Sequence, residues 1–496
     1  MTRPPIRTRS YALVYLFLAG VMLLAHAPFL HLPYYWDEIG QFVPASLDLY
    51  ESGSWIPHST LPNVHPPAVM AYVALTWQAF GTGIQITRGA MLLLAAFGAL
   101  GAFLLTIEIS RGLPGTPAFV ALALLSISPL FYSQSMMVLL DMPAMALTAF
   151  ALLLFLQNRF RACAAVCVVL AMVKETGIVA PALFGVWLLW ERRGIHRGWT
   201  DALWFLLPLP ALSGWLFALH QATGHWFGNA EFTRYNVWYP LHPVRLSLAL
   251  VRRIYYLFVA DGHFLGTAAL VYAWRRVGQF HSREWRVCSA FLIAHTVAVC
   301  LLGGAVLERY LLPVLPILYA AFAISIGVLP RRPRIAVLVA LPVALIASNV
   351  LNPPYPFPFE NNLAWTTYVG LEQQVAYRLG ANPLAEVATA FPLTDALRRP
   401  DFGFVDRKHR VRQLASFRKS DLAPLVANPP DILVTFTQTW DPLHLLRASK
   451  LGGFLQTYYG YEPEATTPEI ERMLGMKSRR VWESRGFEFT LFESQY

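Results

Sequence analysis

The chain has few charged residues and very few cysteines for its length of 496 residues. Lys, Arg, Asp and Glu together make up 14% of it, against about 25% in a typical soluble protein. This deficit excludes an ordinary soluble globular protein. The four cysteines, Cys163, Cys167, Cys288 and Cys300, lie inside apolar runs. They are expected to be small core residues without a disulfide framework.

Apolar residues, by contrast, make up 56% of the chain, and runs long enough to span hydrocarbon recur through the first 350 positions. The net charge of +10 comes largely from arginines in short loops between these runs, which the positive-inside rule explains. We therefore predict a polytopic α-helical membrane protein in contact with the lipid bilayer, and no nucleic-acid partner.

Placing the arginine-bearing short loops in the cytoplasm predicts about 11 transmembrane helices within a membrane domain, 1–351. The apolar segment 66–81 is too short to span comfortably, so it is expected as an interfacial helix within an outer loop, 31–87. The spans are expected at 11–30, 88–110, 117–133, 142–157, 162–173, 177–191, 200–219, 262–275, 286–304, 311–329 and 335–351.

This topology places a set of charged residues on the outer side, near the membrane boundary. Isolated charges beside apolar helices are costly and usually functional. The alternative is that individual members are helix-end residues that face water. The set comprises Asp37, Glu38, His65, Asp141, Lys174, Glu175, Glu231, Arg234, Glu308 and Arg309.

The composition changes after Asn352, where a proline-rich linker leads into a sequence with dispersed charges. Strands are expected at 387–391, 402–405 and 431–437, and a hairpin with Gly486 in its turn near the end. We predict a soluble, extracytoplasmic α/β domain over 352–496. It has no nucleotide-binding motif and no metal-ligand spacing, which favours a structural lid or an acceptor-contacting module.

Paired carboxylates, Asp37 and Glu38, follow the first apolar run, and the loop after them ends in His65-Pro66-Pro67. No Lys or Arg occurs from Tyr34 to Pro67. Outside the cytoplasm there is no nucleotide-sugar pool, so a group-transfer reaction there needs a donor delivered through the membrane. A polyprenyl-phosphate sugar fits this requirement, with a carboxylate as the base for the acceptor and cations holding the leaving phosphate.

Further motifs are Leu140-Asp141-Met142-Pro143, Lys174-Glu175-Thr176-Gly177 and Glu308-Arg309-Tyr310-Leu311-Leu312-Pro313. Together with the Asp-Glu and His-Pro-Pro motifs, they resemble the C-type glycosyltransferases. These include the dolichyl-phosphate-mannose protein mannosyltransferases and the bacterial transferases that move aminoarabinose onto lipid A. The resemblance covers roughly residues 10–350.

The resemblance implies roles for these residues. Asp37 would be the catalytic carboxylate with Glu38 beside it, and Lys174 and Arg309 would lie near the donor phosphate. The chain lacks the long luminal insertion of the eukaryotic mannosyltransferases and ends in an α/β domain, as bacterial members often do. This leaves the acceptor open as a lipid, a polysaccharide or a protein.

Some site residues have two interpretations. His65 either begins the following helix with its prolines, or binds the donor phosphate or orients a carboxylate. Glu308 and Arg309 either pair locally or contact substrate, as do Lys174 and Glu175, although adjacent helical side chains do not face each other. The expected substrate contacts are Asp141, Glu175, Glu308 and Tyr310.

We therefore expect a glycosyltransferase of the cytoplasmic (inner) membrane, with its active site on the extracytoplasmic side. It would transfer a hexose or a pentose from a polyprenyl-phosphate donor. A divalent cation could bind the paired carboxylates, but no complete ligand set is visible. The alternatives are a lipid or lipid-linked sugar flippase and a non-catalytic lipid binder. No two-fold repeat in hydropathy supports a transporter.

Overall fold

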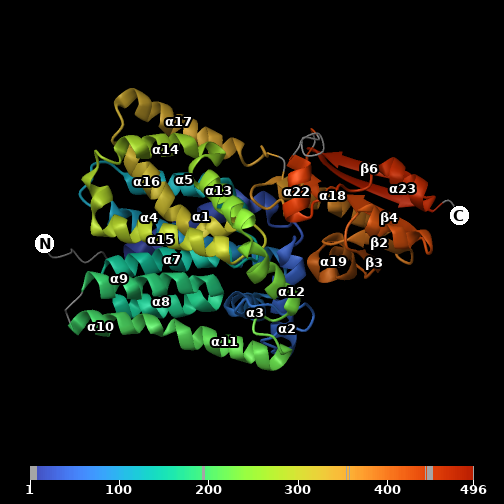
Figure 1. Ribbon diagram of the computed structural model, residues 1–496, viewed down its shortest axis with the longest axis horizontal. Coiled ribbons are helices and arrows are strands. Elements are labelled where there is room, and N and C mark those ends of the chain that lie inside the picture. Colours follow the sequence, from blue (N-terminus) through green and yellow to red (C-terminus); the bar gives the residue numbers. More distant parts are fainter. Residues whose placement is uncertain are drawn as a thin grey trace. The chain divides into compact units, whose positions relative to one another are not determined.

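The chain divides into two compact units, seen in a computed structural model that describes residues 8–192, 196–353, 355–356, 358–441, 443 and 451–494. The helical unit comprises Met1–Leu30 and Val43–Asn349, and the C-terminal unit comprises Val350–Tyr496 together with His31–Phe42. Figure 1 shows most of the helical unit in blue to yellow and residues after Val350 in orange to red. The segment with Asp37 and Glu38 thus belongs to the C-terminal unit, although it is far from it in sequence.

The helical unit consists of α-helices joined by short 3₁₀ or π turns. Its helices are α1 (Thr8–His26), α2 (Val43–Ser52), α3 (Ala68–Phe80), α4 (Ile84–Ile109), α5 (Pro117–Ile127), α6 (Pro129–Gln134), α7 (Asp141–Leu156), α8 (Phe160–Val173), α9 (Val179–Glu191), α10 (His196–Leu203), α11 (Pro208–Thr223), α12 (Ala230–Thr233), α13 (Pro243–Phe258), α14 (His263–Ala273), α15 (Arg283–Leu301), α16 (Leu315–Gly327) and α17 (Arg331–Ala347). This arrangement confirms the predicted polytopic helical architecture.

Among the described residues, six helical stretches are long and apolar enough to cross a membrane, and four shorter apolar helices accompany them. The predicted number of 11 crossings stays a prediction. The segment α3, with 13 residues, is short for a span. The cysteines are buried and free of disulfides, as expected. The six stretches are Tyr11–Phe29, Ile84–Ile109, Trp199–Thr223, Pro243–Ala273, Arg283–Leu301 and Glu308–Gly327.

The close packing of α4 against α7 depends on two glycines. A Cβ atom at Gly98 would lie 2.7 Å from Cε of Met145, and one at Gly101 would lie 3.0 Å from the ring of Phe150. Small residues allow apolar helices to approach closely where no water drives them together. This contact fixes the position of α7, whose first residue is Asp141.

The C-terminal unit is built on a five-stranded mixed sheet with the order β3-β2-β4-β7-β6. β2 runs parallel to β3 and β4, whereas β7 runs antiparallel to β4 and β6. The strands are β2 (Glu386–Ala390), β3 (Arg410–Leu414), β4 (Ile432–Phe436), β6 (Lys477–Ser484) and β7 (Phe487–Glu493), and β1 (Tyr355–Pro356) pairs with β5 (Thr439–Trp440). The helices are α18 (Ala364–Leu379), α19 (Leu393–Arg398), α20 (Lys419–Leu422), α22 (Leu451–Tyr459) and α23 (Thr467–Leu474).

The predicted hairpin near the end of the chain is confirmed. Its loop is Arg485-Gly486, and both residues have positive φ, 50° and 80°, as the tight turns that match strand twist require. The predicted strand at 402–405 is wrong. Phe402 ends a 3₁₀ turn, and Gly403 follows with a φ of 86°, so the chain turns where an extended run was expected.

Candidate functional site

Three charged residues from distant parts of the helical unit meet in its interior. Lys174 Nζ lies 2.5 Å from Asp141 Oδ1, and Arg309 Nε lies 3.3 Å from Asp141 Oδ2. Each of the three residues is buried. Because Asp141 begins α7, the positive end of the helix dipole adds to the stabilisation of its carboxylate. The structure therefore brings both predicted donor-phosphate cations to one carboxylate.

Tyr310 and a histidine complete this cluster. Lys174 Nζ lies 4.1 Å from the centroid of the Tyr310 ring, a cation–π contact. His295 Nε2 donates a hydrogen bond of 2.8 Å to the Tyr310 carbonyl, and its ring stacks on Phe291. The polar lining of the pocket at this cluster also includes Thr148 and Thr176, so it offers hydroxyl groups beside the charges.

A sharp turn between α8 and α9 directs Lys174 and Glu175 to different partners. At Gly177 a Cβ atom would lie 2.7 Å from Cγ of Leu170 and 2.8 Å from its carbonyl oxygen, so only glycine fits. Lys174 points to Asp141, whereas Glu175 points to His65. Lys174 and Glu175 therefore contact Asp141 and His65, respectively, and do not form the local ion pair that the sequence left open.

Glu175 pairs instead with His65, whose Nδ1 lies 2.9 Å from Glu175 Oε2. Burial raises the pKa of Glu175, but the stronger combined effect of His65 and Lys174 lowers it to about 2. The ring of His65 also packs edge-on against Phe232. Both interpretations of His65 thus have structural counterparts, because α3 begins directly after Pro67 and His65 holds a carboxylate.

Glu308 and Arg309 also diverge. Glu308 begins a 3₁₀ segment, η9 (Glu308–Val314), and accepts hydrogen bonds from Arg252 Nε at 2.8 Å and Nη2 at 2.5 Å. Arg309, the next residue, contacts Asp141. Glu308 and Arg309 thus each form an ion pair with a residue distant in sequence, and α13 is tied to η9 through Arg252.

Several polar residues of the helical unit were not predicted as site residues from the sequence. His295 lies within an apolar run, where a polar residue signals a role, and Arg252 lies on the amphipathic helix α13, in a part of the chain to which no span was assigned. Arg88 and Arg253 are buried arginines that donate hydrogen bonds to backbone carbonyls in the helical unit. Each of these side chains is polar or charged and lies in a largely apolar stretch of the sequence.

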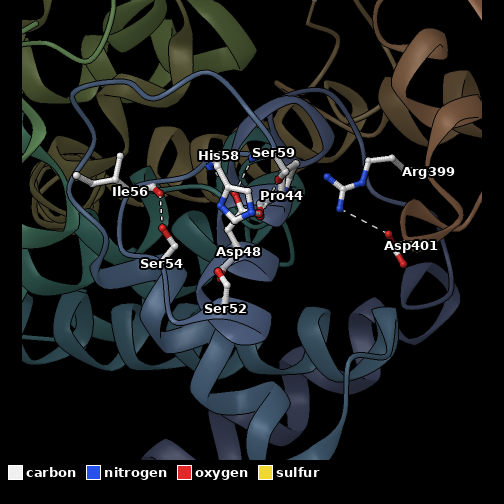
Figure 2. Close-up of polar contacts among 9 residues, drawn as sticks. All are labelled: Pro44, Asp48, Ser52, Ser54, Ile56, His58, Ser59, Arg399 and Asp401. Atoms are coloured by element: carbon white, nitrogen blue, oxygen red, sulfur yellow. Dashed lines mark hydrogen bonds and ion pairs between the residues drawn. The ribbon is translucent and has the colours of Figure 1, made fainter. Parts of the chain in front are cut away.

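The acidic residue Asp48 has a structural role in the loop that leads to His65 (Figure 2). Its Oδ2 accepts hydrogen bonds from the backbone amides of His58 and Ser59, at 2.8 and 2.9 Å. Ser52 Oγ donates to the Asp48 carbonyl at 2.6 Å. Asp48 therefore holds the loop after α2 in place.

Asp37 and Glu38 lie in the C-terminal unit and differ in burial. Glu38 is fully buried, whereas Asp37 is partly exposed. Glu38 Oε2 accepts a hydrogen bond of 3.0 Å from the Tyr35 amide, so this carboxylate closes its own loop. Asp37 directly precedes a π-helical turn, η2 (Glu38–Phe42). Such turns are rare in proteins, and those that occur often lie at functional sites.

A metal site would need several His, Cys, Asp or Glu side chains close together. Within the described part of the chain, no three His, Cys, Asp or Glu side chains come together in the way that a metal site needs. The carboxylates of the site each have other partners, such as Lys174 for Asp141 and His65 for Glu175. The arrangement is suited to binding an anion and to proton transfer.

No protein-family profile matches the sequence, and no curated protein sequence is detectably similar to it. Among solved structures, ArnT from Cupriavidus metallidurans bound to undecaprenyl phosphate is similar over 98% of this chain and 98% of that one, with 15% identity and a TM-score of 0.56. The apo state of ArnT covers 97% of this chain and 98% of that chain, with 15% identity and a TM-score of 0.53.

The oligosaccharyltransferase of Archaeoglobus fulgidus covers 87% of this chain and 70% of its own, with 10% identity and a TM-score of 0.47. A similarity of that size does not define a fold. The two ArnT structures match the chain along nearly its full length, including the C-terminal unit. The chain therefore has the C-type glycosyltransferase fold of ArnT, as its motifs predicted.

Proposed function

We propose that this protein is a membrane glycosyltransferase that transfers a sugar from a polyprenyl-phosphate donor. The observation that carries the proposal is the convergence of Lys174 and Arg309 on Asp141 in the interior of the helical unit. Two cations at one point suit a phosphate, which Arg binds in a fork and Lys as a point charge. The fold of ArnT, whose solved structure holds undecaprenyl phosphate, supports the same donor class.

In the proposed reaction, a nucleophilic oxygen or nitrogen of the acceptor attacks the anomeric carbon of the sugar. The new bond forms as the bond from that carbon to the phosphate oxygen breaks, and the bonding electrons leave with the phosphate. Asp37 takes the acceptor's proton as general base. Lys174 and Arg309 stabilise the charge that builds on the phosphate.

The remaining side chains have supporting parts in this proposal. Asp141 keeps both cations in place, and the ring of Tyr310 supports Lys174 from its side. Glu308 fixes α13 through Arg252. Glu175 and His65 form a polar pair beside Lys174. The sugar, a hexose or a pentose, and the acceptor, a lipid, a polysaccharide or a protein, remain open.

The direct test uses the purified full-length protein in detergent. It is incubated with undecaprenyl-phosphate aminoarabinose or undecaprenyl-phosphate mannose and a membrane extract as acceptor, and the release of undecaprenyl phosphate is measured. Mass spectrometry of envelope glycans, with and without the gene, identifies the product. Movement of the intact donor across vesicle membranes without cleavage would instead support a flippase.

The proposal also places the reaction on the extracytoplasmic side of the inner membrane. With an odd number of crossings and a cytoplasmic N-terminus, the end of the chain lies outside. A reporter that is active only in the cytoplasm, fused after Tyr496, should therefore be silent, whereas a periplasmic reporter should be active. The opposite result would overturn the eleven-span topology and the extracytoplasmic site, but would leave the reaction class to the enzyme assay.

A further inference from the structure

The segment that carries Asp37 is fixed by residues that follow it by more than 300 positions. The Tyr34 amide donates a hydrogen bond of 3.2 Å to the Phe402 carbonyl. The ring of Tyr35 lies 6.0 Å from Trp365 in a stacked arrangement and 5.6 Å from Tyr368, measured between ring centroids. Tyr35 is only 1% exposed. The residues before Asp37 are therefore part of the core of the C-terminal unit.

Trp36, the residue directly before Asp37, has an unusual backbone conformation. Its φ is 49°, in the left-handed region that a bulky residue adopts only where the surroundings impose it. The Trp36 ring packs edge-on against Phe391, with 5.0 Å between the centroids. A Cβ atom at Gly40 would lie 3.0 Å from Cζ of the same Phe391. One phenylalanine thus supports the chain on both sides of Asp37.

The turn itself is closed by Glu38. The Glu38 amide donates to the Tyr35 carbonyl at 3.0 Å, and the Gly40 amide donates to the Trp36 carbonyl at 2.9 Å. Together with the bond from the Tyr35 amide to Glu38 Oε2, these contacts make the turn a closed unit. Because the turn is closed internally and supported by Phe391 from outside, the direction of the Asp37 side chain depends on the C-terminal unit.

We propose that the C-terminal α/β unit is the positioning frame of the Asp37 carboxylate, with Phe391 as the main positioning residue. The inference rests on the proposed function of Asp37 as general base. It gives the C-terminal unit a role different from a lid or an acceptor-binding module. Phe391 touches neither donor nor acceptor in this proposal, and acts only through its contacts with the Trp36 ring and with Gly40.

The first test measures the frame without any substrate. Hydrogen exchange is followed by mass spectrometry on the full-length protein in detergent, for wild type, Phe391→Ala, Phe391→Leu and Phe417→Ala. Phe417 is a matched control, because it is a more deeply buried phenylalanine of the same unit that packs on Phe436. Amides in peptides covering 34–42 should exchange at least about 10-fold faster in Phe391→Ala than in wild type.

Phe391→Leu retains much of the packing volume and should restore most of the protection. In Phe417→Ala, peptides from β4 should exchange faster, whereas those covering 34–42 should change less than in Phe391→Ala. Equal loss of protection at 34–42 in the two alanine variants would overturn the frame. It would mean that any damage to the unit loosens the segment, and that Phe391 has no special part.

The second test is a double-mutant cycle in the donor-cleavage assay, with undecaprenyl-phosphate aminoarabinose and undecaprenyl-phosphate mannose as donors. Phe391→Ala should lower kcat by about 10²-fold, the size expected for a misplaced catalytic group, while KM for the donor changes little. In an Asp37→Asn background the same substitution should lower the residual rate by less than about 2-fold, because the group it positions is already lost.

The outcomes separate the two proposals. If Asp37→Asn is inactive but Phe391→Ala lowers the rate equally in both backgrounds, Asp37 keeps its role and the positioning frame is overturned. If Asp37→Asn is fully active, the base assignment fails, and the frame fails as a device for positioning a base. A loss of exchange protection confined to Phe391→Ala, together with a non-additive cycle, establishes the frame.

Discussion

The two regions that carry the proposed chemistry hold their key side chains by different forces. In the helical unit, Lys174 and Arg309 are held by opposite charge, through the carboxylate of Asp141. In the C-terminal unit, the segment around Asp37 is held by aromatic rings such as Phe391 and by backbone hydrogen bonds. The first arrangement fixes side chains, whereas the second fixes the backbone.

This difference matches what each group does in the proposed reaction. A phosphate competes with a carboxylate for the same cations, so Asp141 is able to give up part of its contacts to Lys174 and Arg309 when the donor binds. A general base instead needs one fixed direction toward the proton that it removes. Packing of the Trp36 ring on Phe391 fixes the backbone on which the Asp37 side chain stands.

The largest expected effect follows substitution of the base. Asp37→Asn keeps the shape of the side chain but cannot accept a proton at neutral pH, so kcat for donor cleavage should fall by about 10²–10⁴-fold. Binding of the donor should be nearly unchanged, which a tritiated undecaprenyl-phosphate sugar would measure. Glu38→Gln should cost less, because Gln retains an oxygen that accepts from the Tyr35 amide.

The reverse ranking would reassign the base. A protein with inactive Glu38→Gln and active Asp37→Asn would keep the reaction class and move proton transfer to the buried carboxylate. A double variant with the transfer rate of wild type would remove this segment from the chemistry. Translocation of intact donor by that double variant would favour the flippase alternative.

The next effect concerns the cations. Lys174→Ala and Arg309→Ala each remove one contact to the charge developing on the phosphate, which should cost about 2–4 kcal/mol of transition-state stabilisation, or roughly 30- to 1000-fold in kcat. Arg283→Ala is the matched control, because Arg283 makes a two-point ion pair with Glu191 in the same unit and lies outside the cluster. It should leave the rate of donor cleavage close to wild type.

A loss of folding must be separated from a loss of catalysis in these variants. Removing one partner of a buried ion pair destabilises a protein by about 3–5 kcal/mol, whereas removing both charges costs much less. Lys174→Met leaves the buried pair of Asp141 and Arg309 in place, so it should keep more thermal stability than Asp141→Asn, which removes the carboxylate that both cations share. Donor cleavage by Lys174→Met should nevertheless stay low. Donor cleavage by Lys174→Met at the rate of wild type would mean that Lys174 is purely structural.

The ionic region, which comprises Asp141, Lys174 and Arg309, could largely be predicted from the sequence. Lys174 and Arg309 stand out as charges beside apolar helices, and local chain geometry excludes contact between adjacent helical residues. The sequence could not tell that both would meet Asp141, because that depends on how α7, α8 and η9 pack. Arg252 was not predicted as a site residue, because no span was assigned to 220–261, where the structure has the amphipathic α13.

The aromatic region, which is the segment around Asp37 with the rings that pack on it, could not be predicted from the sequence in this way. The motif Tyr35-Trp36-Asp37-Glu38 follows the first apolar run, and tyrosines and tryptophans at such a place are also typical of a membrane interface. Its partners Trp365, Tyr368 and Phe391 are separated from it by the whole helical unit in sequence. Aromatic packing leaves no local pattern of spacing or charge, so only the tertiary structure identifies it.

A smaller effect, on stability, tests the aromatic core beneath this segment. Glu372 of α18 is fully buried, and among the described residues neither of its carboxylate oxygens has a hydrogen-bond partner. Burial raises the pKa of Glu372 to about 8, and the pKa of Tyr35 is raised by its own burial and, to a smaller extent, by the charge of Glu372. The folded protein thus keeps a proton on Glu372 that the unfolded chain releases near pH 4.5.

Because the folded state binds the extra proton, stability should be highest below about pH 4.5 and fall as the pH rises toward 8. The slope is about 1.4 kcal/mol per pH unit at most, and it should end above pH 8. Glu372→Gln should remove this part of the dependence. Thermal unfolding of the full-length protein between pH 5 and 9 checks it, and parallel curves for the two proteins would contradict a neutral buried Glu372.

The smallest expected effect belongs to the hydrogen-bonded pair of His65 and Glu175, which is partly exposed and should contribute no more than about 1 kcal/mol. The pKa of Glu175 is lowered to about 2, so this stabilisation should be present above about pH 4.5 and be lost as the pH falls toward 2. Glu175→Gln should then lower the melting temperature slightly at pH 7 and not at pH 2. If Glu175→Gln lowers kcat as strongly as Lys174→Ala without a comparable loss of stability, Glu175 contacts the substrate, and the ionic region extends beyond Asp141 to the pair at His65.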